Sequence, residues 1–210
     1  MTTAGSPDRH HDLRTRAFDD LRRFEVVMEG HFDYGNGFHG RLYLNPHRLF
    51  QLPSTIWRVA QDLIDVMPSE FSQEAQVIAG PATGGALLAH TMAGLLDGRR
   101  TMSHPPYRFA PLGSTEGRPM LSDFYKKLVH GQRVLLADDV RNTGHTLKRC
   151  ADLVRAAGGE VIGTVVIIDR CEAEVSSGVP NVALIDYKAP PNYAAASCPM
   201  CAAGKAITHF

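Results

Sequence analysis

Short apolar runs alternate with helical periods along the second two thirds of the chain. The apolar runs that read as strands lie at 76–79, 133–137, 161–168 and 182–185. Uninterrupted apolar runs are typical of strands that are buried on both faces. Segments at 85–96 and 146–157 carry apolar residues at helical spacing, and Gly158 ends the second of them. This alternation predicts an α/β fold, a parallel sheet flanked by helices.

The N-terminal part has a different texture. It predicts a polar, disordered tail at 1–12, a helix at 14–29, a glycine-rich turn or short hairpin at 30–40, a strand at 41–44, and a helix after an N-cap at Ser54. Residues 105–125 are rich in Pro, Gly and Ser and predict a long exposed loop. No linker or repeat divides the rest, so we expect one domain from residue 13 to residue 210.

The composition of the chain argues against several classes of function. The 210 residues hold 22 Lys plus Arg and 22 Asp plus Glu, and this balance argues against a basic nucleic-acid surface. No apolar run reaches the roughly 18 residues of a membrane span, and the N-terminus shows no apolar leader. Four cysteines do not make a disulfide framework. We therefore expect a cytoplasmic protein with reduced thiols.

The strongest chemical signal follows the apolar run 133–137. Two adjacent carboxylates, Asp138 and Asp139, come directly after it, and a turn of small and hydroxyl residues at 142–146 leads into the next helix. Backbone N–H groups at such a turn can hold a phosphate dianion. The carboxylates suit the hydroxyls of a ribose or a Mg²⁺ ion instead. The unit predicts a site for a sugar phosphate; the alternative is that the two aspartates only cap the helix.

A second glycine-rich turn, GPATGG at 80–85, joins the run 76–79 to the helix 85–96. Its glycines allow a ligand to approach the backbone closely, and the helix directs its positive end there. The turn suits a pyrophosphate; an ordinary strand-to-helix turn is the alternative.

Residues 134–147 resemble the phosphoribosyl pyrophosphate signature of type I phosphoribosyltransferases, with Asn142 where the family usually has Thr. The resemblance implies that Asp138 and Asp139 contact the ribose hydroxyls and that Mg²⁺ is a cofactor, held through the substrate and by these two residues. It implies that the 5′-phosphate is bound by Asn142, Thr143, Gly144, His145 and Thr146. It implies that the pyrophosphate is bound by Ala82, Thr83, Gly84 and Gly85.

Further segments resemble the orotate branch of that family, over roughly residues 14–207. They are Gly30-His31-Phe32, Asn36 to Gly40 with Tyr43, the pair Asp169-Arg170, and Cys198-Pro199-Met200-Cys201. The resemblance implies transfer of phosphoribosyl to orotate, giving orotidine 5′-monophosphate and pyrophosphate in pyrimidine biosynthesis. It implies a core at about 51–187 under a small hood built from about 13–50 and the C-terminal segment.

The expected base contacts are Arg170, whose guanidinium suits a carboxylate, and Tyr43, which could stack on the ring. An internal ion pair with Asp169 or Glu172 is the alternative for Arg170, and a half-buried core position the alternative for Tyr43. Lys126 and Lys127 are the expected catalytic cations, brought over the pyrophosphate by the 105–125 loop. The resemblance suggests that this loop reaches a neighbouring subunit, which implies a homodimer.

Three departures keep other functions open. Gly84 and Gly35 stand where orotate enzymes often carry lysine, and Ala110–Gly113 stands where they often carry an Arg-Lys cluster. The alternatives are transfer to a purine or another base, and a regulator that only senses phosphoribosyl pyrophosphate. Cys198 and Cys201 have the CxxC spacing, but zinc needs four ligands and the sequence offers no obvious partners. A structural turn or a reduced thiol pair is therefore the preferred interpretation.

Overall fold

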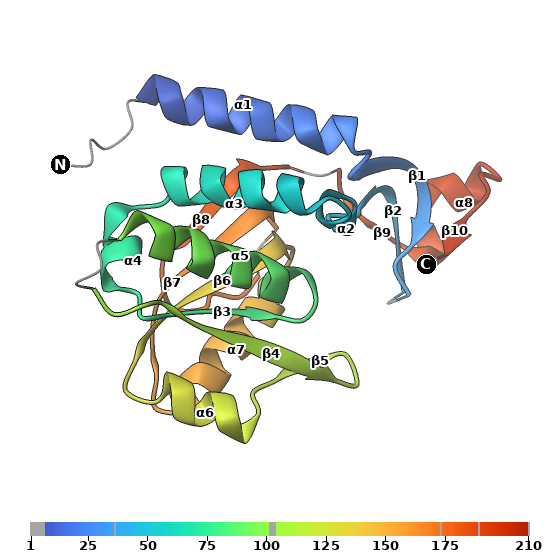
Figure 1. Ribbon diagram of the computed structural model, residues 1–210. Helices are drawn as coiled ribbons and strands as arrows, with labels where there is room; N and C mark the ends of the chain where they lie inside the picture. Colours follow the sequence, from blue (N-terminus) through green and yellow to red (C-terminus); the bar gives the residue numbers. More distant parts are fainter. Residues whose placement is uncertain (1–6, 36, 101–103, 173, 189, 210) are drawn as a thin grey trace.

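The computed structural model describes residues 7–35, 37–100, 104–172, 174–188 and 190–209. Its centre is a six-stranded sheet of order β5-β4-β3-β6-β7-β8 (Figure 1). All neighbouring strands in it are parallel except β4 and β5, which form an antiparallel hairpin. The expected α/β fold is confirmed.

The elements have the following bounds. The strands of the main sheet are β3 (Val77–Pro81), β4 (Arg108–Thr115), β5 (Arg118–Met120), β6 (Arg133–Arg141), β7 (Glu160–Asp169) and β8 (Asn181–Asp186). The helices are α1 (Pro7–Arg23), α2 (His47–Phe50), α3 (Pro53–Val66), α4 (Ser69–Glu74), α5 (Gly84–Arg99), α6 (Asp123–Val129), α7 (His145–Ala156) and α8 (Pro199–Ala202), with a 3₁₀ turn at Ala195–Ser197.

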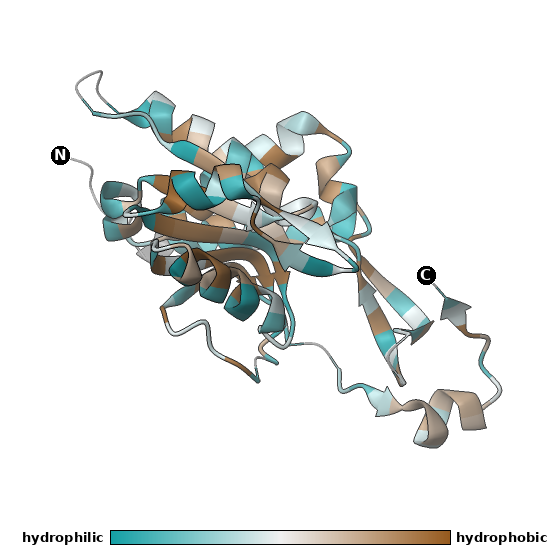
Figure 2. Ribbon diagram, turned by 90° about the horizontal axis from the view of Figure 1, so that it is seen from below, coloured by the Kyte–Doolittle hydropathy of each residue, from teal (hydrophilic) through white to brown (hydrophobic). Residues whose placement is uncertain are grey.

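Helices cover the main sheet on both faces, with α1, α3 and α5 on one side and α6 and α7 on the other (Figure 1). Strand β6 shows how the sequence produces these two layers. Leu135 and Ala137 are buried with the residues of α3 and α5, whereas Val134 and Leu136 are buried with those of α7. This alternation follows from the period of two along a strand. Figure 2 shows the resulting apolar strands between amphipathic helices.

A second, four-stranded sheet joins the hairpin that follows α1 to the C-terminal segment (Figure 1). Its order is β10-β1-β2-β9, with β1 (Val27–Asp33) and β2 (Phe38–Leu44) forming a hairpin. The C-terminal segment supplies β9 (Tyr193–Ala194) and β10 (Thr208–His209) to its two edges. We call this unit, β1, β2 and the segment 193–209, the hood.

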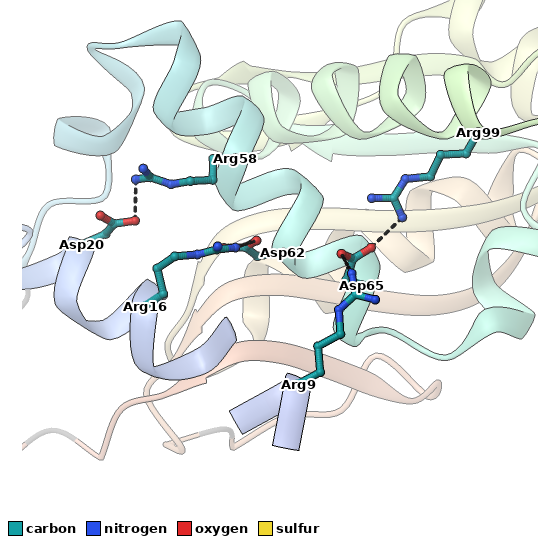
Figure 3. A network of polar contacts seen from close by, with 7 residues as sticks. All are labelled: Arg9, Arg16, Asp20, Arg58, Asp62, Asp65 and Arg99. Atoms are coloured by element: carbon teal, nitrogen blue, oxygen red, sulfur yellow. Dashed lines mark hydrogen bonds and ion pairs between the residues drawn. The ribbon is translucent and has the colours of Figure 1, made fainter. Parts of the chain in front are cut away.

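Ion pairs fasten α1 to α3 and α3 to α5 (Figure 3). Asp65 of α3 accepts from Arg9 of α1 at 3.0 Å and from Arg99 of α5 at 2.7 Å. Asp62, which is buried, pairs with Arg16 of α1. Burial raises the pKa of Asp62, although the Arg16 guanidinium opposes this effect. Helix α1 is thus held by polar contacts as well as by its apolar face.

Helix α1 corrects two expectations. It begins at Pro7, so residues 7–12 belong to a helix and not to the disordered tail expected at 1–12, while residues 1–6 lie outside the described part. Arg9, in the added part of the helix, pairs with Asp65 of α3. It ends at Arg23, so the expected helix at 14–29 is too long. The left-handed conformation of Glu25 (φ 50°) interrupts the helix, and β1 starts two residues later.

The expected long loop at 105–125 is also wrong. Residues 108–120 form the β4–β5 hairpin, and α6 begins at Asp123. Glu116 and Gly117, both at positive φ, make the two-residue turn between the paired residues Thr115 and Arg118. Proline and glycine concealed this hairpin in the sequence. Within the described residues, no helix is both long and apolar enough to span a membrane.

Candidate functional site

A cavity of about 420 Å³ opens at the carboxyl ends of β3, β4 and β6, a size typical of small-molecule sites. Parallel strands present their carboxyl ends at the same edge of a sheet, and ligands of α/β proteins bind there. The lining residues come from the loop after β3, the β4–β5 hairpin, the end of β6 with the turn into α7, the residue after β7, the hood, and the segment 45–47 that follows β2. The site is therefore assembled from segments far apart in the sequence.

Asp138 and Asp139, the acidic pair, both line this cavity from the last half of β6. The Oδ1 atom of Asp138 accepts from the Asp139 N–H at 2.9 Å, and Oδ1 of Asp139 accepts from the Val140 N–H at 2.8 Å. Burial raises the pKa of Asp138 well above its usual range, and the charge of Asp139 adds to this shift. Burial likewise raises the pKa of Asp139. Hydroxyl donors or a cation would relieve both costs.

The strand continues past the acidic pair to Arg141, so the turn is shorter than the sequence indicated. Gly144, at φ 89°, is the N-cap of α7, and a Cβ there would lie 2.5 Å from the Val175 carbonyl oxygen. Asn142 and Thr146 line the cavity on either side of it. Thr143, Gly144 and His145 lie in the same turn but do not line the cavity; the Thr143 hydroxyl contacts the His145 ring at 3.0 Å. Their role with a phosphate stays a prediction.

The second turn, between β3 and α5, brings Ala82, Thr83 and Gly84 to the cavity, while Gly85 lies just behind it. The Ala82–Thr83 peptide bond is cis. A Cβ on Gly84 would lie 2.0 Å from an Asp139 carboxylate oxygen, and one on Gly85 would lie 2.8 Å from Asp138. Only glycine allows the first turn of α5 to approach the acidic pair this closely. The N-terminus of this 16-residue helix thus faces the cavity.

Arg170 lines the cavity from the residue after β7 and is only 7% exposed. Its Nη2 pairs with Glu172 at 3.1 Å, while its buried Nε has no hydrogen-bond partner among the described residues. Of the two internal pairs weighed from the sequence, that with Glu172 forms, whereas Asp169 pairs with Arg141. An unpaired buried donor costs free energy unless a ligand satisfies it.

Tyr43 lines the cavity from β2, as the base contact requires. The sequence analysis missed Tyr34, which also lines it and hydrogen-bonds through its hydroxyl to the Leu42 carbonyl. It missed His47 as well, whose charge lies close enough to Asp139 to lower the pKa of that carboxyl. Tyr34 directly follows β1 and His47 follows Pro46, and no local pattern marks either residue. Asn36, part of the resemblance, lies outside the described residues.

Lys126 and Lys127 do not line the cavity of their own chain. Both lie exposed on α6, where Lys126 pairs with Asp123 at 2.9 Å. The β4–β5 hairpin that precedes them does reach the cavity, through Ser114 and Gly117. Among the described lining residues, Arg170 is the single lysine or arginine. The catalytic role expected of the two lysines therefore stays a prediction.

The fold and the site are typical of α/β proteins that bind phosphate groups at the carboxyl edge of a parallel sheet. The features that indicate this class are the sheet itself, the two turns at helix N-termini and the acidic pair. Comparison with known proteins specifies the class. The family profile described as phosphoribosyl transferase domain matches residues 53–183. The orotate phosphoribosyltransferase of Erythrobacter litoralis is 31% identical over 81% of this chain and 83% of its own length. That of Sphingopyxis alaskensis is 30% identical over 86% of this chain and 87% of its own length.

Solved structures share the fold. The crystal structure of orotate phosphoribosyltransferase from Aeropyrum pernix has a TM-score of 0.64 at 21% identity, covering 81% of this chain and 93% of that chain. That of the Mycobacterium tuberculosis enzyme in complex with Fe(III) dicitrate has a TM-score of 0.62 at 18% identity, covering 83% and 96%. The chain belongs to the phosphoribosyltransferases and, within them, to the orotate phosphoribosyltransferase family, so the resemblance seen in the sequence is confirmed.

Proposed function

We propose that the protein transfers the 5-phosphoribosyl group from phosphoribosyl pyrophosphate to orotate, giving orotidine 5′-monophosphate and pyrophosphate, a step of pyrimidine biosynthesis in the cytoplasm. One observation carries the proposal. The acidic pair, two turns at helix N-termini and Arg170, whose buried Nε has no hydrogen-bond partner among the described residues, all contribute to the lining of one cavity. Relatives at about 30% identity are named for this activity.

The proposal assigns each part of the donor to a part of the cavity. The ribose hydroxyls donate to Asp138 and Asp139, the 5′-phosphate accepts from the turn 142–146, and the pyrophosphate accepts from the turn 82–85. Both turns precede helices whose backbone N–H groups and dipole favour anions. A Mycobacterium tuberculosis orotate phosphoribosyltransferase of similar fold, with a TM-score of 0.55, was crystallised with this donor.

The reaction breaks the bond between ribose C1 and the pyrophosphate oxygen, and a ring nitrogen of orotate forms the new bond to C1. The ring-nitrogen proton leaves, and the bond electrons leave with pyrophosphate. Positive charge develops on the ribose and negative charge on the leaving group. The amides at 82–85 are fixed donors for that negative charge, and fixed donors stabilise it better than mobile water does.

The base is assigned to the side of the cavity formed by Arg170, Tyr34 and Tyr43. An orotate carboxylate would accept from the unpaired Nε of Arg170, and a planar guanidinium matches a carboxylate well. The fold alone does not select the base, because an adenine phosphoribosyltransferase from Thermoanaerobacter pseudethanolicus also matches with a TM-score of 0.57. The buried donor of Arg170 favours a carboxylated base over a purine.

Mg²⁺ fits the acidic pair. Oxygen ligands are those that Mg²⁺ prefers, and both carboxyls are buried at the cavity, where a cation would offset the cost of their negative charge. Asp138 and Asp139 would hold the ion together with oxygens of the substrate. When bound, the ion supplies positive charge to the leaving pyrophosphate.

We also propose a homodimer in which Lys126 and Lys127 serve the cavity of the partner subunit. The cavity needs more positive charge than Arg170 provides, and the two lysines follow a hairpin that already reaches it. Phe124 on the same helix is 70% exposed and Met120 of β5 is 47% exposed, which is consistent with an interface.

Turnover with a panel of bases tests the activity. Purified protein with Mg²⁺ and phosphoribosyl pyrophosphate should release pyrophosphate with orotate, and far less with uracil, adenine or hypoxanthine. If pyrophosphate were released only with a purine and not with orotate, transfer to a purine would replace the proposed activity. Donor binding by calorimetry without release for any base would identify the sensing regulator.

Subunit complementation tests the dimer. A variant with Lys126→Ala and Lys127→Ala, and the variant Asp139→Asn, are each expected to be weakly active. Coexpressed with different affinity tags and purified as the mixed dimer, they should regain activity, because one of the two cavities then has an intact acidic pair and intact lysines. No recovery in a mixed dimer would show that the lysines do not act across subunits.

A further inference from the structure

Four side chains of the hood meet away from the cavity. They are His31 of β1, His39 of β2, Cys198 at the N-cap of α8, and Cys201 within α8. We call them the Cys₂His₂ cluster. Each contributes one atom capable of binding a metal, and these four atoms all lie within 4.8 Å of one another. No other such group of three or more occurs in the part of the chain that the structure describes.

The distances within the cluster suit one tetrahedral ion. Zinc binds Cys sulfur at about 2.3 Å and His nitrogen at about 2.0–2.1 Å, so neighbouring ligand atoms are separated by roughly 3.3–3.8 Å. His31 Nε2 lies 3.2 Å from His39 Nδ1, 3.5 Å from Cys198 Sγ and 3.7 Å from Cys201 Sγ. Cys201 Sγ lies 3.2 Å from His39 Nδ1. An ion can enter with shifts of a few tenths of an ångström.

The hydrogen bond that His31 makes on the side away from the cluster also indicates a metal site. Its Nδ1 lies 3.0 Å from the carbonyl oxygen of Lys205, which can only accept a hydrogen bond. Nδ1 therefore carries the proton, and the lone pair of Nε2 faces the cluster. Metal-binding histidines commonly donate their other ring nitrogen to such a carbonyl, which fixes the tautomer. The contact also ties the chain after α8 to β1.

Burial separates this cluster from an ordinary surface group. His31 is 3% exposed, His39 7% and Cys198 3%, while Cys201 lies at the solvent edge. Two imidazoles and two thiols are a good zinc donor set, because Zn²⁺ with two thiolates and two neutral histidines carries no net charge. The two thiol protons are released to solvent on binding.

We propose that the Cys₂His₂ cluster is a structural zinc site that fastens the C-terminal segment to the β1–β2 hairpin. Apart from the cluster, two short strand pairings hold that segment to the hairpin: β9 pairs two residues with β2, and β10 pairs two residues with β1. Pairings of this length add little stability alone. Four protein ligands leave no open position, so the site is structural and not catalytic. The same hairpin carries Tyr34 and Tyr43 to the cavity.

Metal content tests the proposal independently of enzymatic activity. Protein purified without chelator should contain about one zinc per chain by mass spectrometry. The variants Cys198→Ser and Cys201→Ser should lose most of it, whereas Cys171→Ser, an exposed cysteine outside the cluster, should retain it. Zinc retained in both cluster variants, or iron in its place, would overturn the assignment.

A second measurement needs no variant. Wild-type protein stripped of metal and given Co²⁺ should show the visible bands of a tetrahedral ion and the near-ultraviolet bands of cobalt–thiolate bonds. Its unfolding temperature should fall on stripping and return with Zn²⁺. The proposal would be overturned if the purified protein contained no zinc and the stripped protein gave no cobalt spectrum. It would also be overturned if Cys198 and Cys201 formed a disulfide in the cell.

Discussion

Asp139→Asn is expected to separate the catalytic role of the acidic pair from its cost to stability. The side chains have the same shape, and the asparagine Oδ1 can still accept from the Val140 N–H, which lies 2.8 Å from Oδ1 of Asp139. The fold should therefore be retained. What changes is the charge and one hydrogen-bond acceptor at the cavity.

Activity and stability should move in opposite directions. A hydrogen bond to a charged group contributes about 1.5–3 kcal/mol, so kcat/KM for the phosphoribosyl donor should fall roughly 10- to 150-fold. Burial raises the pKa of Asp139, so its ionised form costs stability at neutral pH. Each pKa unit of that shift corresponds to about 1.4 kcal/mol, or roughly 3–6 °C in Tm for a domain of this size. The variant should therefore melt at a higher temperature.

The pH dependence of the Tm gain checks its origin. A raised folded-state pKa contributes stability below the unfolded-state pKa, and this contribution is lost as the pH rises through the folded-state pKa. The advantage of the variant should therefore be full above the folded-state pKa of Asp139 and fade as the pH falls toward the unfolded-state value of about 4. The measurements are pyrophosphate release and thermal melts. Asp152→Asn, in an exposed ion pair with Lys148, should change neither. Full activity of Asp139→Asn, or a lower Tm at neutral pH, would refute the reasoning.

Three further substitutions probe the turn between β3 and α5, the base contact and helix α1. Gly84→Ala places a Cβ 2.0 Å from a carboxylate oxygen of the acidic pair and should lower kcat/KM roughly 100-fold. Gly94→Ala is the control, because a Cβ there has no neighbour within 4 Å, and it should leave kcat/KM unchanged. Equal effects of the two substitutions would exclude the close approach to the acidic pair as the cause. Arg170→Gln should raise KM for orotate about 10- to 150-fold with donor affinity unchanged by calorimetry; a matching loss of donor affinity would contradict it. Arg16→Ala leaves buried Asp62 unpaired and should cost about 1–3 kcal/mol in urea unfolding at neutral pH. That loss should shrink in acid, as Asp62 protonates, and a constant loss would contradict it.

Elements that are determined by residues close together in the sequence could be predicted from the sequence alone. β7 was visible because most of its residues are apolar, and the turn after the acidic pair was visible because strand, acidic pair and turn are contiguous. The β4–β5 hairpin was not visible. Its buried alternation at Ala110 and Leu112 is interrupted by proline and glycine, which local propensity assigns to loops.

The Cys₂His₂ cluster shows the other limit. Cys198 and His31 lie 167 positions apart, and their contact depends on the C-terminal segment pairing with the N-terminal hairpin. Spacing within Cys198-x-x-Cys201 cannot supply the two missing ligands. The preference for a thiol pair over a metal followed from that gap, and the proposal of a zinc site rests on His31 and His39, which the fold brings to the two cysteines.

The charge around the cavity explains why its parts must come from several sources. Two carboxyls line the cavity, the proposed donor is strongly anionic, and Arg170 is the single lysine or arginine among the described lining residues. Arg170 is moreover shared with Glu172. Amides at two helix N-termini offset part of this repulsion. The proposed function assigns the remaining positive charge to two sources outside the lining of this chain, Mg²⁺ and the α6 lysines of a partner subunit. In that proposal the two sources are complementary.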